Sequence, residues 1–241
     1  MEKLNIIYED EYVVAINKPA NLLTIPDRYN PNLPSLSKLL KAQYGEIFVV
    51  HRLDYGTTGV ILFARTKEAH FVLNEQFHNR QINKIYSAVL SGVLRQDEME
   101  IDIPLLQNSA KKGGVIPSAR GKESLTILKV EKRYRNATLV SARLLTGRQH
   151  QLRVHTAAIG YPLLVDDFYG NASSFFVSSL KKRFKLKKGS VEAPIISRPT
   201  LHSREITFSH ITKDRITISA DYPKDFSALL QVLDKYASSN Q

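Results

Sequence analysis

The chain has 241 residues, of which 43% are hydrophobic and 24% charged, so it can bury a substantial core and is not intrinsically disordered. It contains no cysteine, which excludes disulfides, zinc-thiolate sites, iron–sulfur clusters and thiol nucleophiles. The formal net charge of +11 favours a nucleic-acid partner over a role in solubility alone, because phosphate attraction supplies most sequence-independent affinity.

Signals for membrane insertion and metal binding are missing from the sequence. No run approaches the roughly 20 apolar residues of a membrane span, and the first residues lack the layout of a secretory signal, which predicts a cytoplasmic protein. The spacing between His150 and His155 does not align two metal ligands on one helix face. We therefore expect neither a metal site nor a cofactor.

Apolar patterning at the start of the chain predicts strands mixed with helices. Residues 4–16 have the pattern of a hairpin with a charged turn at 9–11. Thr66 is placed to cap a helix, since apolar residues follow it at helical spacing. The other elements predicted here are a helix near 36–40 and strands at 47–50, 60–64 and 85–89, the last with alternating side chains.

The rest of the chain predicts more strands than helices. Residues 107–122 are polar and predict a mobile loop. Gly160 takes the C-terminal position of a helix on which Leu152 packs while Arg153 points into a cleft. Further strands are predicted at 125–130, 137–145, 206–208 and 216–220, and a closing helix carries Phe226, Leu229, Leu230 and Leu233. This order indicates an α+β fold with a mostly antiparallel mixed sheet and flanking helices.

Residues 173–198 form a basic segment, with no acidic residue between Asp167 and Glu192. Its basic residues are Lys181, Lys182, Arg183, Lys185, Lys187 and Lys188. The segment is either a solvated surface or a set of phosphate contacts, and charge clustering alone leaves both readings open.

Two polar segments concentrate reactive side chains after apolar strands. In the first, one carboxylate, Asp54, lies two residues after Arg52 and just ahead of a predicted buried strand. The second supplies two more arginines, Arg148 and Arg153. Rigid scaffolds present reactive groups in this way, so we expect the aspartate and the arginines to converge on one cleft that acts on a polyanion.

The segment His51–Gly59 resembles the signature of the RluA-type pseudouridine synthases, and companion segments match that family in the same order over about residues 6–230. The companion segments are Asn17–Pro19, Lys84–Ala88, Thr146–His155, Gly160–Pro162 with Tyr169–Gly170, and Leu201–Ser203. The departures are mild. Asn21 stands where the family usually has glycine, Thr58 where serine is commoner, and Val165 where glycine usually precedes the aspartate.

The resemblance implies a pseudouridine synthase catalytic fold with a central RNA-binding cleft. It implies one catalytic domain over residues 1–241, with a basic insertion at about 173–198 and without the S4-type domain of many relatives. The implied activity is isomerisation of uridine to pseudouridine in structured RNA, with large-subunit ribosomal RNA as the main substrate and transfer RNA as the alternative. The expected partner is RNA, bound by a monomer.

Site roles also follow from the resemblance. Asp54 is the essential carboxylate, acting either at C1′ of the ribose or by abstracting a ribose proton, and the sequence leaves both routes open. Arg153 is the cation beside Asp54, and Tyr86 stacks on the uracil and assists removal of the C5 proton. Arg52 enters the stack when the base is extruded. The residues expected to contact phosphates are Arg148, Lys181, Lys182 and Arg183.

Two rival functions fit part of the pattern. An RNA-binding module without activity explains the charge but not the aspartate beside an arginine ahead of a buried strand. A base glycosylase or nuclease shares base extrusion, but it usually needs an activated water or clustered carboxylates. Mass spectrometry separates hydrolysis, which loses the base, from isomerisation and binding, which leave the RNA mass unchanged, and detection of pseudouridine separates the last two.

Overall fold

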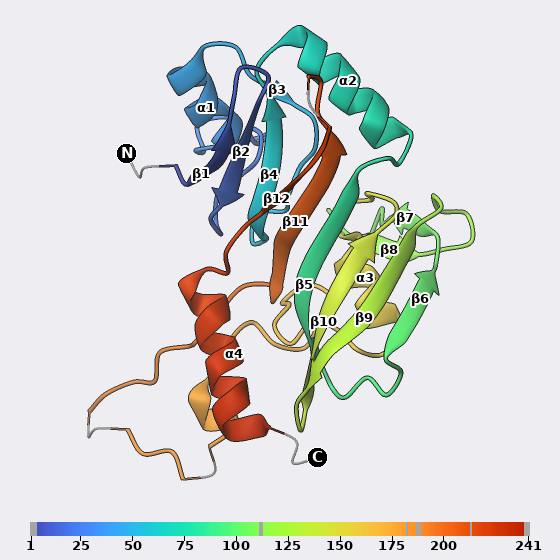
Figure 1. Cartoon of the computed structure of the whole chain (residues 1–241). Coiled ribbons are helices and arrows are strands. Elements are labelled where there is room, and N and C mark those ends of the chain that lie inside the picture. Colours follow the sequence, from blue (N-terminus) through green and yellow to red (C-terminus); the bar gives the residue numbers. More distant parts are fainter. Residues whose placement is uncertain (1–3, 111–112, 182, 187–188, 213, 239–241) are drawn as a thin grey trace. The chain divides into compact units, whose positions relative to one another are not determined.

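The computed structural model describes residues 4–110, 113–181, 183–186, 189–212 and 214–238 (Figure 1). Contacts between residues group the chain into two compact units. The first unit consists of Met1–Tyr86 with His202–Asp221, and the second of Ser87–Leu201 with Tyr222–Gln241. The expected single domain with its insertion stays a prediction.

A mixed sheet forms the centre of the first unit. Its strands are β1 (Ile6–Glu9), β2 (Val13–Lys18), β3 (Phe48–Val49), β4 (Thr58–Ala64), β5 (Asn83–Ser91), β11 (Leu201–Ser209) and β12 (Arg215–Ser219). Their order is β1-β2-β4-β11-β5, with β12 paired to β11 and β3 to β4. β4 is antiparallel to β2 but parallel to β11. Every residue of β4 is buried, as its continuous apolar run predicts.

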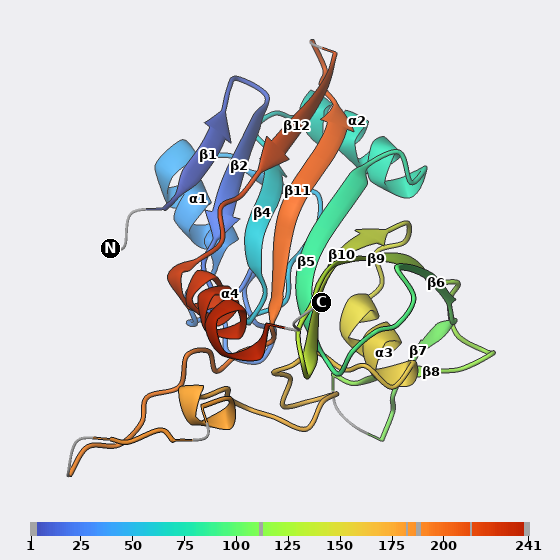
Figure 2. The ribbon, with the colours of Figure 1, turned by 60° about the horizontal axis from the view of Figure 1, so that its bottom comes forward.

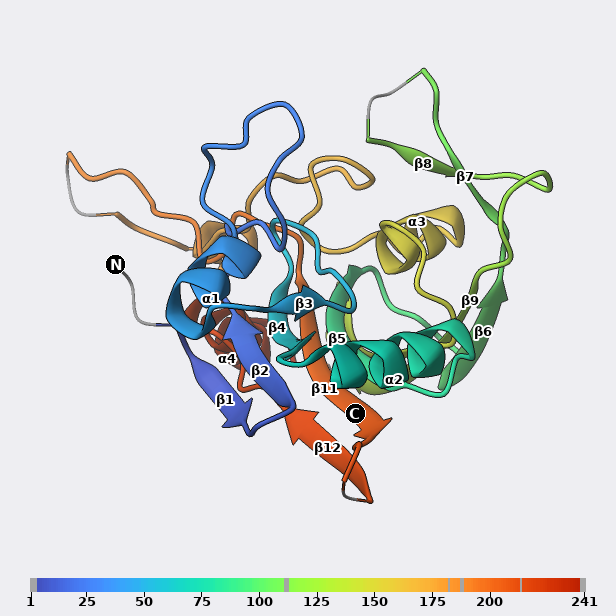
Figure 3. The ribbon, with the colours of Figure 1, turned by 90° about the horizontal axis from the view of Figure 1, so that it is seen from above.

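Two helices flank this sheet. α1 (Leu36–Tyr44) lies beside β1 and β2, and α2 (Lys67–His78) packs against β4 (Figure 3). The Ala69 N–H donates to Thr66 Oγ1 at 3.1 Å, which confirms the predicted N-cap of α2. Leu73 of α2 belongs to a buried cluster with Leu62 of β4 and Phe208 of β11, so the apolar face of the helix covers one face of the sheet.

The second unit combines an antiparallel sheet with two helices. Its strands are the end of β5, β6 (Glu98–Asp102), β9 (Leu125–Arg133) and β10 (Ala137–Leu144), in the order β5-β10-β9-β6, and a separate pair, β7 (Leu105–Gln107) with β8 (Val115–Pro117). These strands curve around α3 (Gln151–Ala158) (Figure 2). α4 (Lys224–Ala237) buries Phe226, Leu229 and Leu233 in a core shared with β10.

The elements predicted from strong periodicity are confirmed. They are the first hairpin, the helices near 36–40, 67–77, 152–159 and 226–233, and the strands at 60–64, 125–130, 137–145, 206–208 and 216–220. The hairpin turn is held by Asp10, whose Oδ1 accepts from the backbone N–H groups of Tyr12 and Val13. Within the described residues, no helix is both long and apolar enough to span a membrane.

Two local predictions were wrong. The strand at 85–89 does not alternate, because every residue from Tyr86 to Leu90 is buried. Its polar member, Ser87, tolerates burial because its hydroxyl bonds to the hydroxyl of Tyr222 at 2.8 Å. The polar stretch 107–122 contains β8, a strand too short to show periodicity. Lys111 and Lys112 in this stretch lie outside the described residues.

Candidate functional site

Asp54 lies in a loop whose backbone is fixed on both sides of the carboxylate. Thr24 Oγ1 donates to the Leu53 carbonyl at 2.9 Å and accepts from the Leu53 N–H at 3.2 Å. On the other side, the backbone carbonyl of Asp54 accepts from the Thr57 N–H at 3.1 Å. Just beyond this turn the chain enters the fully buried strand β4. The loop therefore presents the carboxylate from a rigid support.

Lys18 anchors this loop through hydrogen bonds to backbone carbonyls. Its side chain is fully buried, and Nζ donates to the carbonyls of Pro19 at 3.0 Å, Leu22 at 2.8 Å and Tyr55 at 3.2 Å. Three carbonyl acceptors satisfy the three donors of an ammonium group, which makes its burial tolerable. The lysine-proline segment thus ties the residue after Asp54 to the end of β2.

The start of β4 is packed tightly against β11. Gly59 has φ +110°, and a Cβ at this position would overlap the backbone of Ser203, so only glycine fits. The neighbouring Thr58 Oγ1 bonds to His202 Nδ1 at 2.9 Å, and His202 Nε2 bonds to the Ala220 carbonyl at 3.1 Å. Since a carbonyl only accepts, Nε2 carries the proton and Nδ1 accepts from Thr58.

Tyr86 is the second predicted site residue in the first unit. Its side chain is 7% exposed on β5 and hydrogen-bonds to Ser203. Burial raises the pKa of the Tyr86 hydroxyl to about 12, the bond to Ser203 acts in the opposite direction, and the negative charge of Asp54 adds to the rise. Asp54 and Tyr86 therefore interact electrostatically, and the phenol is neutral at physiological pH.

His51 has a structural role in the same loop. Its Nε2 accepts from the Leu62 N–H at 2.9 Å, and its ring packs against Phe77. Burial, with a smaller contribution from the positive charge of Lys84, lowers the pKa of His51 to about 3. Burial also lowers the pKa of Lys84 to about 8. A neutral acceptor is what the Leu62 bond requires, so His51 anchors the loop to β4.

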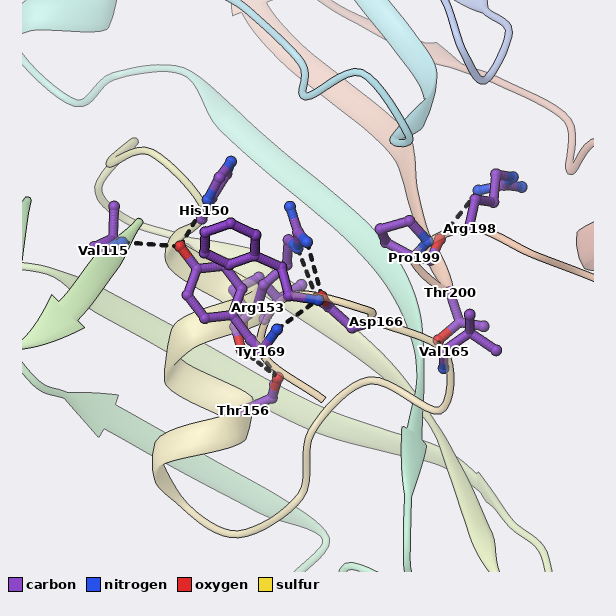
Figure 4. Close-up of polar contacts among 12 residues, drawn as sticks. Val115, His150, Arg153, Thr156, Val165, Asp166, Tyr169, Arg198, Pro199 and Thr200 are labelled. Atoms are coloured by element: carbon purple, nitrogen blue, oxygen red, sulfur yellow. Dashed lines mark hydrogen bonds and ion pairs between the residues drawn. The ribbon is translucent and has the colours of Figure 1, made fainter. Parts of the chain in front are cut away.

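Arg153 belongs to the second unit and is paired with a carboxylate there (Figure 4). Its Nε donates to Asp166 Oδ2 at 2.7 Å and its Nη2 to Asp166 Oδ1 at 2.8 Å. Arg153 is 7% exposed and Asp166 is 1% exposed. Burial would raise the pKa of the Asp166 carboxyl, but Arg153 and two backbone N–H groups outweigh it and lower that pKa below its usual value. The pairing of Arg153 with Asp54 stays a prediction.

Tyr169 completes this cluster. Its ring centroid is 5.1 Å from the guanidinium carbon of Arg153. Its hydroxyl accepts from the Val115 N–H at 2.9 Å and lies 2.7 Å from His150 Nδ1 (Figure 4). One tyrosine therefore contacts the arginine, the strand β8 and the residue that precedes α3.

The other predicted RNA contacts lie on more open parts of the chain. Arg52 is exposed in the Asp54 loop, and Arg148 is partly buried with Nε donating to the Glu123 carbonyl at 3.0 Å. Lys181 and Arg183 are exposed, whereas Lys182 lies outside the described residues. Among the residues with described positions, no three histidine, aspartate or glutamate side chains gather as a metal site requires.

Sequence reasoning missed the residues that support the site. Lys18, Asp166 and Tyr169 were noticed only as parts of family-like segments, and no role was assigned to them. Their signal was the combination of ionisable or hydroxyl side chains with apolar neighbours, which predicts burial with a partner. The partner itself depends on tertiary contacts that local spacing does not encode.

Comparisons with known proteins identify similar chains. A family model described as RNA pseudouridylate synthase matches residues 12–158. The dual-specificity RNA pseudouridine synthase RluA of Vibrio vulnificus is 36% identical over 85% of this chain and 77% of its own. The ribosomal large subunit pseudouridine synthase D of Haemophilus ducreyi is 34% identical over 95% of this chain and 70% of its own. The solved structure of human RNA pseudouridylate synthase domain containing 4 has a TM-score of 0.75 and 25% identity, covering 95% of this chain and 93% of that chain.

Proposed function

The chain belongs to the RNA pseudouridylate synthase family, and from this premise we propose that it isomerises specific uridines in structured RNA, with large-subunit ribosomal RNA as the main substrate. The reaction breaks the N1–C1′ bond, turns the freed uracil and joins C5 to C1′. The proton lost from C5 balances the proton gained at N1, so the reaction needs no oxidant or reductant.

The observation that carries the proposal is the rigid loop that holds Asp54, together with the charge interaction between Asp54 and Tyr86. Asp54 is the carboxylate that attacks C1′ or removes a ribose proton. Tyr86, on β5, provides a ring for stacking on the uracil and a hydroxyl for moving the C5 proton. The clamp by Lys18 and the bonds of Thr24 keep the carboxylate in place while the base moves.

The charge of Asp54 also couples the two residues during the reaction. An ester at C1′ and a protonated carboxyl are both neutral, so either route removes for a time the negative charge that adds to the rise that burial causes in the pKa of Tyr86. Joining C5 to C1′ releases the Asp54 carboxylate again, and the C5 proton leaves only after that bond has formed. Asp54 therefore acts first and Tyr86 last.

RNA recognition is assigned to basic residues other than this pair. A uridine in structured RNA must leave its stack before it can react, at a cost of a few kcal/mol. Arg52, exposed on the Asp54 loop, is the residue that we propose fills the vacated space. Arg148, Lys181, Lys182 and Arg183 are proposed phosphate contacts, supported by the net charge of +11.

Transfer RNA is the second candidate substrate, because the similar Vibrio vulnificus protein is named a dual-specificity enzyme. Mapping pseudouridines in total RNA with and without the gene distinguishes the two substrates. A cytoplasmic location and a monomeric state stay predictions.

The proposal is tested with Asp54→Asn on structured RNA. We expect wild-type protein to convert uridine to pseudouridine at constant RNA mass, and Asp54→Asn to make none while still binding RNA. The backbone bonds of Leu53 and Thr57 do not involve the replaced carboxylate, so the loop should keep its fold.

The matched control is Asp214→Asn, which removes the same charge from an exposed position in the first unit and should leave conversion unchanged. Turnover by Asp54→Asn, or release of free uracil by the wild type, would overturn the assignment.

A further inference from the structure

We propose that Asp166 and Tyr169 are positioning residues that hold Arg153 in one orientation for the reaction. This inference rests on the proposed function and on the role that the family resemblance gives Arg153, as the cation beside Asp54. The two bonds from Asp166 engage Nε and Nη2, so they fix both the plane and the rotation of the guanidinium. Nη1 lies at the opposite edge of the plane.

Asp166 is itself fixed before it meets the arginine. Its Oδ1 accepts from the backbone N–H groups of Phe168 at 2.9 Å and Tyr169 at 3.0 Å. Its carbonyl accepts from the Gly170 N–H at 3.1 Å, and a Cβ at Gly170 would lie 2.8 Å from that carbonyl oxygen. The tight turn 166–170 therefore sets the carboxylate, and the carboxylate sets Arg153.

The ring of Tyr169 contacts one face of the Arg153 guanidinium, a geometry that favours a cation. Because the Tyr169 oxygen accepts from Val115, its O–H proton is available for His150 Nδ1. The hydroxyl thus links β8 to the start of α3, the helix that carries Arg153 (Figure 4).

A purely structural role is the alternative, and the chain offers a matched case. Arg198 and Asp225 form a second bidentate pair in the same unit, at 2.7 and 2.9 Å. Arg198 also donates to the carbonyls of Pro199 and Leu201, so this pair ties the backbone ahead of β11 to the start of α4. Asp225→Asn therefore disrupts a second bidentate ion pair, whose aspartate is more exposed than Asp166, without touching Arg153.

The experiment compares Asp166→Asn and Asp225→Asn by thermal unfolding, RNA affinity and single-turnover rate at saturating RNA. Both variants should unfold at lower temperature. We expect Asp166→Asn to lower the rate about 100-fold, as a small misplacement of a catalytic group does, while its affinity for RNA changes little. Asp225→Asn should keep the wild-type rate. Equal rates for the two variants, measured where both are folded, would overturn the inference.

Tyr169→Phe separates the ring from the hydroxyl. It keeps the ring over Arg153 but loses the hydrogen bonds that link β8 to His150, so we expect a smaller fall in rate, about 10-fold. An unchanged rate would overturn the positioning role of the Tyr169 hydroxyl.

Chemical rescue provides a readout that a purely structural role would not change. Added guanidinium ions should restore part of the rate of Arg153→Ala, because Asp166 can hold the ion where the side chain was. They should fail in Arg153→Ala/Asp166→Asn, a double variant that leaves neither charge buried and so remains testable if Asp166→Asn alone does not fold. Equal rescue of both would contradict a positioning role. An inactive wild type would instead refute the proposed function.

Discussion

The environment of Tyr86 keeps its hydroxyl protonated at neutral pH. Burial raises the pKa of its hydroxyl to about 12, and the nearby Asp54 carboxylate contributes in the same direction. A neutral phenol stacks on a uracil without repelling the phosphates around it. The hydroxyl can donate or accept a hydrogen bond while the uracil turns.

Tyr86→Phe tests this role of the hydroxyl. The ring remains, so RNA affinity should stay within a few-fold of the wild type, while the single-turnover rate should fall by about 10²–10⁴ if the hydroxyl moves the C5 proton. Rapid-quench measurement of pseudouridine at saturating RNA gives the rate. Phe71→Ala, which removes an exposed aromatic residue on α2, is the control and should change neither quantity. An unchanged rate in Tyr86→Phe would rule out the hydroxyl.

Single residues also show where sequence reasoning reaches its limit. Asp54 stood out because an ionisable group precedes a continuous apolar strand, and that pattern is local. The partner of Arg153 could not be predicted in this way. Asp166 lies in the segment after α3 and contacts the arginine only in the folded unit. Pairing between distant ionisable groups is a tertiary property, and spacing alone does not reveal it.

At the level of elements, the apolar pattern of a segment explains whether the sequence predicted it correctly. β4 was found because its apolar run is unbroken, and α4 because its apolar residues recur at helical spacing. The alternation expected near Tyr86 was wrong because β5 is buried through five consecutive residues, and β8 was missed because three residues carry no period.

The link between the Asp54 loop and β4 should make the first unit sensitive to acid. His51 must be neutral to accept from the Leu62 N–H, and burial holds its pKa at about 3, against about 6.5 in an unfolded chain. Because the folded pKa is the lower one, the unfolded state binds the proton first as the pH falls. The stabilisation is therefore fully present above pH 6.5 and is lost progressively toward pH 3.

Denaturant unfolding at pH 7, 6 and 5 measures this loss. We expect the free energy of unfolding to drop by about 1–2 kcal/mol between pH 6.5 and 5 from His51 alone. His51→Gln keeps an acceptor for Leu62 but does not titrate, so its curve should be flatter by that amount. His155, whose pKa burial also lowers, contributes equally to both proteins and cancels in the comparison. Parallel curves would show that His51 is not the sensitive group.

For the molecule as a whole, net charge indicates a polyanionic partner but not where it binds. The formal charge of +11 is a property of composition, and any distribution of the lysines and arginines gives the same value. Within the basic segment, Lys181, Arg183 and Lys185 are exposed, which both a solvated surface and a phosphate-binding surface require. Only the salt dependence of binding separates these two possibilities.

Replacing Lys181, Arg183 and Lys185 together by alanine should weaken RNA binding and flatten its salt dependence. Removing one phosphate-binding side chain lowers the slope of log K against log salt by about 0.7–0.9, so removing all three should lower it by about 2–3. The rate at saturating RNA should stay near normal, because these residues are not assigned to the reacting ring. The measurement is binding to Asp54→Asn protein across a salt series, which prevents turnover.

The control triple variant, Lys41→Ala, Lys67→Ala and Lys129→Ala, removes the same formal charge from exposed positions on α1, α2 and β9. Long-range attraction alone would make the two triple variants equivalent, since each lowers the net charge equally. Direct phosphate contacts instead make the slope depend on which basic side chains are removed, because counterions are released only where such a side chain replaces them at the RNA. A flatter slope in the basic-segment variant than in the control would place RNA against that segment, whereas equal slopes would confine the phosphate contacts to residues such as Arg52 and Arg148.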